Sequence, residues 1–170
     1  MKREFEFTEA TPLIQWIESH KEKWIGQKIA HYYRDRRTGP GEAPAVFVVG
    51  EWAVIVEFLW PSCLAVTIVE RESFLADTSL NFLYKDIPES RNVRFAEFCF
   101  DDKTEFVGKR ITNILVNRFS GEHETHPDLG GVRPKGGDYF AAITVELSNG
   151  NSFSICAENA LFDGYMTVWE

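Results

Sequence analysis

Short apolar segments of strand length run through most of the chain and predict a mainly β protein. Some are continuous apolar runs, which are typical of buried strands, and others alternate apolar with polar residues, which is the period of a strand that buries one face. The predicted strands span residues 28–33, 45–49, 52–59, 64–71, 110–118, 139–148, 152–157 and 165–169. The long segment between the fourth and fifth of these strands has no pattern that predicts a definite arrangement.

A single helix is predicted ahead of the strands. Thr11 stands before Pro12, and this order is typical of a helix start, because a threonine hydroxyl caps the first turn and proline suits the first helical position. Apolar residues then share one stripe through residues 12–24, Ile14 and Ile17 among them. Gly26 follows the last apolar residue and ends the helix.

Two short motifs indicate an internal duplication. Residues 24–30 and residues 106–112 both run aromatic, aliphatic, glycine, polar, basic, isoleucine, small. Residues 54–58 likewise resemble residues 143–147, and the change of spacing falls in the loops between the blocks, where insertions cost little. Chance similarity among strand segments is the alternative explanation.

The duplication defines the expected fold class. We expect an α+β, mainly β protein in which two antiparallel β-rich pseudo-repeats share one core, with one N-terminal amphipathic helix packed on the sheet. The pseudo-repeats cover about residues 24–70 and 106–159 of a single domain, residues 1–170. Outward positions are polar in 143–148 but mainly apolar in the matching 54–59. We therefore expect the helix, or alternatively a partner protein, to cover that face of the first repeat.

The clearest local signal is the pair Asn149-Gly150. Asn-Gly accepts positive φ at both central positions of a turn, which predicts a tight two-residue hairpin. The apolar residues that alternate on either side of it are Val145, Leu147, Phe153 and Ile155.

The charge balance narrows the classes of partner. The chain has 18 Lys and Arg against 26 Asp and Glu, a formal net charge of −8 over 170 residues. This balance argues against a general binder of nucleic acid or of anionic membranes, since both need positive charge. Residues 51–170 hold 10 basic and 19 acidic residues, and no Lys or Arg follows Tyr139. The second half is therefore the source of a negative field that attracts a basic protein partner.

Cysteine usage and the N-terminal residues predict the compartment. Cys63, Cys99 and Cys156 are odd in number and widely spaced, which favours reduced thiols over disulfides or a zinc site. The first residues contain no apolar stretch typical of a secretory signal. Charges and a proline interrupt residues 46–69, which argues against a membrane span there. We expect a cytoplasmic protein that is not a membrane protein and needs no cofactor.

The densest set of possible metal ligands lies in residues 121–128. His123, His126 and Asp128 could together bind a divalent metal ion, since imidazole and carboxylate are usual donors. Pro127 makes a helix unlikely to place these side chains on one face. A solvated loop is the alternative, although a stretch as long as residues 119–138 is often functional.

Acidic residues of the second half form the predicted partner-binding surface. They are Glu122, Glu124, Asp128, Asp138 and Glu146. A second hypothesis pairs Glu57 with Glu146 across the two repeats, because paired carboxylates can carry out acid–base chemistry; two ordinary strand glutamates are the alternative.

Function follows from these features only in outline. The chain has neither a GxSxG nor an HExxH motif. We therefore expect a non-enzymatic binding protein, such as an inhibitor or immunity-type protein that covers a basic toxin or nuclease. A small-molecule-binding β domain and a metal-dependent enzyme that uses the 119–138 loop are the alternatives. Exposed strand edges in a duplicated fold would also suit a twofold homodimer.

Overall fold

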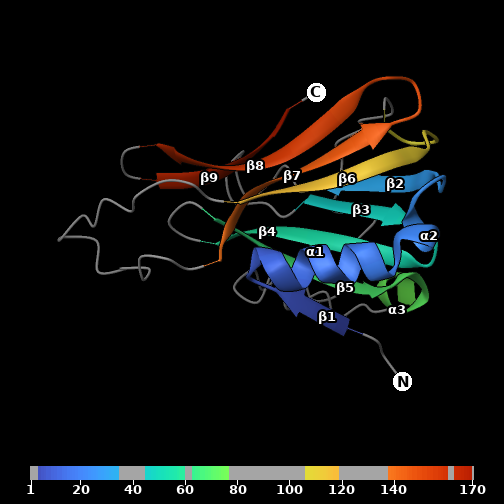
Figure 1. The fold of residues 1–170 in the computed structure, drawn as a ribbon, viewed down its shortest axis with the longest axis horizontal. Coiled ribbons are helices and arrows are strands. Elements are labelled where there is room, and N and C mark those ends of the chain that lie inside the picture. The colour runs from blue at the N-terminus through green and yellow to red at the C-terminus, as the bar shows by residue number, and fades with distance from the viewer. Residues whose placement is uncertain are drawn as a thin grey trace.

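A computed structural model describes residues 4–34, 45–59, 63–76, 106–118, 138–160 and 163–169. Strands predominate in this part of the chain, and a helix lies near the N-terminus, as the sequence predicts (Figure 1). In chain order the elements are β1 (Glu4–Phe7), α1 (Ala10–Ser19), α2 (Lys21–Trp24), β2 (Ile29–Arg34), β3 (Ala45–Val49), β4 (Trp52–Leu59), β5 (Cys63–Glu70), α3 (Arg71–Ala76), β6 (Ile111–Arg118), β7 (Phe140–Leu147), β8 (Ser152–Ala160) and β9 (Asp163–Trp169). All eight predicted strands are confirmed, with ends within three residues of the predicted ones.

The strands form two antiparallel sheets. One sheet has the order β1-β5-β4-β3-β2, and the other has the order β6-β7-β8-β9. The second sheet lies over the first in Figure 1, and β4 and β5 contact β7, β8 and β9 across the space between them. Antiparallel neighbours follow one another along the chain in both sheets, so short turns suffice to connect most of them. The additional strand β1 joins the edge of the first sheet beside β5.

The turn between β3 and β4 is a two-residue loop. Val49 and Trp52 are register partners, so Gly50 and Glu51 form the loop. Gly50 has φ +55°, which suits the first central position of a type II′ turn. The predicted strand ends at residues 49 and 52 are therefore confirmed.

The turn between β7 and β8 differs from the predicted one. The N–H of Leu147 donates to the carbonyl of Asn151 at 2.8 Å, which leaves three residues in the loop. Gly150 has φ +83°, whereas no non-glycine residue described has positive φ. The loop is therefore a turn followed by a left-handed glycine, and the prediction of positive φ at Asn149 is wrong. Asn149 instead accepts a hydrogen bond from the N–H of Asn151 through its side-chain oxygen at 3.1 Å.

The two sheets are joined where β2 and β6 begin. Lys28 and Arg110 form a single antiparallel bridge there, and both belong to the two similar motifs. Four backbone hydrogen bonds surround the bridge: Gly26 N–H to Ile111 O (2.8 Å), Gly108 N–H to Ile29 O (2.8 Å), Ile29 N–H to Lys109 O (2.9 Å) and Ile111 N–H to Gln27 O (2.9 Å). Each bond has a counterpart in which the motif that supplied the donor now supplies the acceptor, at the equivalent positions. We call this region the sheet junction.

The second pair of similar blocks does not occupy matching places. Residues 54–58 lie in β4, the third strand from the sheet junction, whereas residues 143–147 lie in β7, the second strand from it. Counted from the junction, the counterpart of β4 is β8. The predicted match is therefore displaced by one strand. Buried strands share the same alternation of branched apolar residues, so a five-residue match does not identify one strand among several.

The core lies between the two sheets and α1. Strands of both sheets contribute to it, with Phe47 and Val54 on one side and Ile143 and Phe153 on the other, all almost fully buried. Leu13 and Trp16 extend it from α1. Among the described residues, both faces of β3 and β4 are closed to solvent, because residues that point away from this core are also buried. These are Val46, Val48, Ala53 and Ile55.

Helix α1 packs on the inner face of the first sheet. Leu13 and Ile17 lie beside Val54 and Val66, which point between the sheets. The expectation that the helix covers the Ile55 face is therefore wrong, although its packing on the sheet is confirmed. The reason is that α1 also contacts β6. It contacts β1 of the first sheet and β6 of the second, and it lies in front of β4 and β5 in Figure 1.

The start of the predicted helix and its continuity differ in the structure, whereas its last residue, Trp24, is as predicted. His20 ends α1 and separates it from α2, with its ring stacked 4.0 Å from that of Trp16. The helix starts at Ala10, and Glu9 at the N-cap provides no side-chain cap. Thr11 is therefore a first-turn residue and not the predicted cap. Within the described residues, no helix has the length and apolar character needed to cross a membrane.

Two of the three cysteines fall within the described residues. Cys63 is buried and Cys156 is half-buried, and neither forms a disulfide in the structure. This agrees with the prediction of reduced thiols for these two residues. Cys99 lies outside the described residues.

Candidate functional site

The start of α1 is held by residues of the second sheet. The N–H of Ala10 donates to the backbone carbonyl of Asp138, and the N–H of Thr11 donates to Oδ2 of Asp138, both at 2.6 Å. Arg118 donates from Nε to Oδ1 of Asp138 at 3.0 Å and from Nη2 to Oγ1 of Thr11 at 3.1 Å. We call Thr11, Arg118 and Asp138 the helix clamp.

The helix clamp supplies the capping that Glu9 does not provide. A helix start has unpaired N–H groups and a partial positive charge, and a carboxylate satisfies both. Hydrogen bonds from the side chain and backbone of Thr11, and then the neighbouring Arg118, hold the pKa of Asp138 below its ordinary value. Asp138 is therefore ionised at neutral pH and serves as a hydrogen-bond acceptor, which is unsuited to proton transfer there.

The clamp also encloses the ends of the longest predicted loop. Arg118 is the last residue of β6, and Asp138 is the first described residue beyond residues 119–137. Their ion pair therefore brings the two ends of this segment together on α1. Arg118 was not among the site residues predicted from the sequence. The signal that could have identified it is its position immediately before residues 119–137, with Asp138 immediately after them.

Most of the predicted site residues fall in that segment. Glu122, His123, Glu124, His126 and Asp128 lie outside the described residues, so the predicted metal site stays a prediction. In the described part of the chain, no three residues among His, Cys, Asp and Glu are grouped to hold a metal ion.

The two described acids of the predicted partner surface are far apart. Asp138 lies just before β7, and Glu146 lies near its other end, so eight residues of extended chain separate them by about 26 Å. Glu146 is half-buried and stands opposite Asn113 and Ser152 in the register. Asp138 therefore belongs to the helix clamp, while Glu146 belongs to the outer face of the second sheet.

Glu57 has a different acidic neighbour from the predicted one. It lies on β4 and is half-buried. Burial, and then the charge of Glu6 on β1, raises the pKa of Glu57. Glu146 lies on the other sheet and is not among the causes of this shift. The hypothesis that pairs Glu57 with Glu146 therefore finds no support in the electrostatics.

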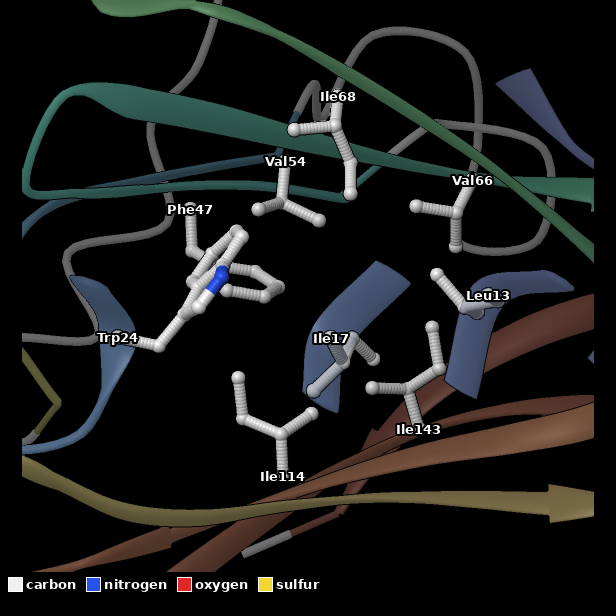
Figure 2. Close-up of a pocket in the computed structure, with 9 residues that line it drawn as sticks. All are labelled: Leu13, Ile17, Trp24, Phe47, Val54, Val66, Ile68, Ile114 and Ile143. Carbon is white, nitrogen blue, oxygen red and sulfur yellow. The ribbon is translucent and has the colours of Figure 1, made fainter. Parts of the chain in front are cut away.

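A small cavity lies where α1 meets both sheets (Figure 2). Its volume is about 20 Å³, whereas sites for drug-sized ligands measure about 300–1,000 Å³. All the lining side chains are apolar: Leu13, Ile17, Trp24, Phe47, Val54, Val66, Ile68, Ile114 and Ile143. Without polar partners the cavity does not hold an ordered water well. It is a packing gap and offers no room for an organic ligand.

Comparison of the chain with protein-family models, with curated proteins and with solved structures found no match.

Proposed function

We propose that this protein is a non-catalytic binding protein that holds a basic protein partner, in the manner of an inhibitor or immunity-type protein. The observation that supports this most is the outer face of β7 and β8. Ile143, Val145 and Phe153 point into the core. The residues between them, such as Thr144 and Glu146, therefore point outward.

This outer face is free of positive charge and held in place by hydrogen bonds. No Lys or Arg occurs from residue 139 to residue 170, which includes all of β7, β8 and β9. The hydroxyls of Thr144 and Ser154 are 2.7 Å apart, and Asn117 donates to Thr144 at 3.5 Å. A basic partner would meet hydroxyls and the carboxylate of Glu146 here, with no repulsion to overcome.

A charge reversal on this face tests the proposal. The variant Glu146→Lys places a cation in the cation-free strands, and Glu22→Lys makes the same change on exposed α2. Binding to a basic protein encoded beside the gene is measured by calorimetry. We expect Glu146→Lys to weaken binding about tenfold and Glu22→Lys to have little effect, because rim charges act mainly within a Debye length. Equal binding by wild type and Glu146→Lys would contradict the use of this face.

We also infer that the chain arose by duplication of a β-rich half. The exchange of hydrogen bonds at the sheet junction, with Gly26 and Gly108 in equivalent roles, is what a twofold axis between the motifs would require. The strand orders outward from the junction, β2-β3-β4-β5 and β6-β7-β8-β9, also correspond. Superposition of β2–β5 on β6–β9 in an experimental structure would test this inference, and unlike strand twists or registers would contradict it.

The metal-dependent alternative is tested separately. Metal analysis of the purified protein, with His123→Ala and His126→Ala as comparison variants, is the direct measurement. One equivalent of bound metal that both substitutions remove would favour this alternative over a purely binding role.

A further inference from the structure

Three positive side chains at the sheet junction have no carboxylate partner among the described residues. They are Lys28, Lys109 and Arg110, which are all exposed and take part in none of the ion pairs of the described chain. Three other cations of the described chain do have such partners: Lys21 with Glu18, Lys23 with Glu51, and Arg118 with Asp138. Acids outnumber bases in this chain, so the unpaired cations are not explained by a shortage of carboxylates.

Two of these cations stand directly opposite each other. Lys28 and Arg110 are the two partners of the antiparallel bridge, so their side chains leave the backbone on the same face. Like charges at directly opposite positions destabilise a strand pair. An anion bound between them would turn this repulsion into attraction.

Arg110 is already oriented for such a ligand. Its Nη1 donates to the carbonyl of Gly26 at 2.6 Å, and the N–H of Gly26 is itself bonded to the carbonyl of Ile111. One end of the guanidinium is thus fixed by rigid backbone. The remaining N–H groups keep the planar fork that binds two oxygens of one anion.

We propose that the sheet junction is an anion-binding site for a single phosphate group, with Lys28 and Arg110 as direct ligands and Lys109 as a further source of charge. Phosphate carries a charge of about −1.5 to −2 at pH 7, which suits several cations better than a carboxylate does. A polyanion such as nucleic acid is disfavoured, because the chain as a whole has a net charge of −8. The site is distinct from the outer face of β7 and β8 proposed for the basic partner.

Titration of the full chain with inorganic phosphate tests this site. Chemical shifts of the Gly26 and Gly108 amides are followed by NMR, with acetate at the same ionic strength as the comparison anion. We expect saturable phosphate binding with these amides among the most shifted, and weak, unsaturated changes with acetate. Equal responses to both anions would show general screening and would overturn the proposal. Pyrophosphate, added in a separate titration, shows whether a phosphate within a larger molecule binds as well as the free ion.

Three variants assign the binding to the named residues. Lys28→Gln and Arg110→Gln should each weaken phosphate binding about tenfold, as expected for loss of a charge-assisted hydrogen bond. Lys21→Gln, which removes a cation paired with Glu18, should bind as wild type does. Lys28→Gln removes a like-charge contact, so the variant should remain folded and its binding remain measurable. Unchanged affinity in Lys28→Gln and Arg110→Gln would overturn the assignment.

Discussion

The carboxylate of Asp138 accepts a hydrogen bond from the first turn of α1 while it pairs with Arg118. At the scale of single residues, this contact explains how α1 is capped although its own N-cap residue, Glu9, makes no side-chain hydrogen bond to the helix. The sequence places Asp138 and Thr11 far apart, and only the fold brings them together. No local pattern could have predicted the contact, because capping rules read adjacent residues.

Asp138→Asn should lower the melting temperature at pH 7 by a few degrees, because the charge at the helix start is lost. The pKa of Asp138 is lowered in the folded protein, so its stabilising effect is present above the unfolded-state pKa. The effect is lost as pH falls through the folded-state pKa. The melting temperatures of variant and wild type should therefore converge once the pH falls below the folded-state pKa of Asp138. A constant difference at every pH would contradict an electrostatic role for this carboxylate.

Glu57→Gln should have the opposite effect on stability. Burial and Glu6 raise the pKa of Glu57, so the folded state is penalised whenever this carboxylate is ionised. The penalty is fully present above the folded-state pKa, declines as pH falls from the folded-state to the unfolded-state pKa, and is absent below the latter. We expect a gain of up to about 1 kcal/mol in the free energy of unfolding at pH 7, and none at about pH 3. Denaturant unfolding at the two pH values measures this, and a loss of stability at pH 7 would contradict it.

At the scale of elements, the sequence predicted the strands better than their arrangement. Nearly continuous runs of apolar residues predicted β3 and β4 to the residue. They did not predict which face α1 covers, because both faces of these strands are apolar and buried. Burial on both sides removes the polar–apolar contrast that would indicate the face toward the helix.

The cavity beside α1 should respond to filling. Val66→Ile adds one methylene next to a gap of about 20 Å³ and should raise the free energy of unfolding by about 0.5–1 kcal/mol. Val49→Ile makes the same change at a fully buried core position that does not line the cavity, and should cost about 1 kcal/mol through overpacking. Chemical denaturation of both variants tests the prediction, and equal losses would contradict the placement of the cavity.

The two turns at the sheet junction should respond alike to substitution. Gly26 has φ +80° and Gly108 has φ +82°, and a Cβ at either would meet no atom within 4 Å. Only backbone strain therefore opposes Gly26→Ala and Gly108→Ala, and each should cost about 1–2 kcal/mol. Costs that differ by more than the error of denaturant unfolding would contradict the equivalence of the two motifs.

At the scale of the whole molecule, two similar motifs meet at the sheet junction, and the cation-free strand β7 ends beside them, where Leu147 stands opposite Ile111. The sequence predicted the motifs and the distribution of charge. It did not predict that the motifs bond to each other, because hydrogen bonds between residues about 80 positions apart depend on the fold. Of the residues predicted to bind a partner or a metal ion, only Asp138 and Glu146 lie in the described residues, and the fold assigns them to different places.

The central proposal is that the cation-free outer face of β7 and β8 binds a basic protein. Calorimetric titration of the chain with a basic protein encoded beside its gene, at about 50 mM and about 300 mM salt, tests it most directly. We predict a one-to-one complex whose affinity falls at least about tenfold at the higher salt. The same affinity at both salt concentrations, or no complex at the lower one, would contradict the claim.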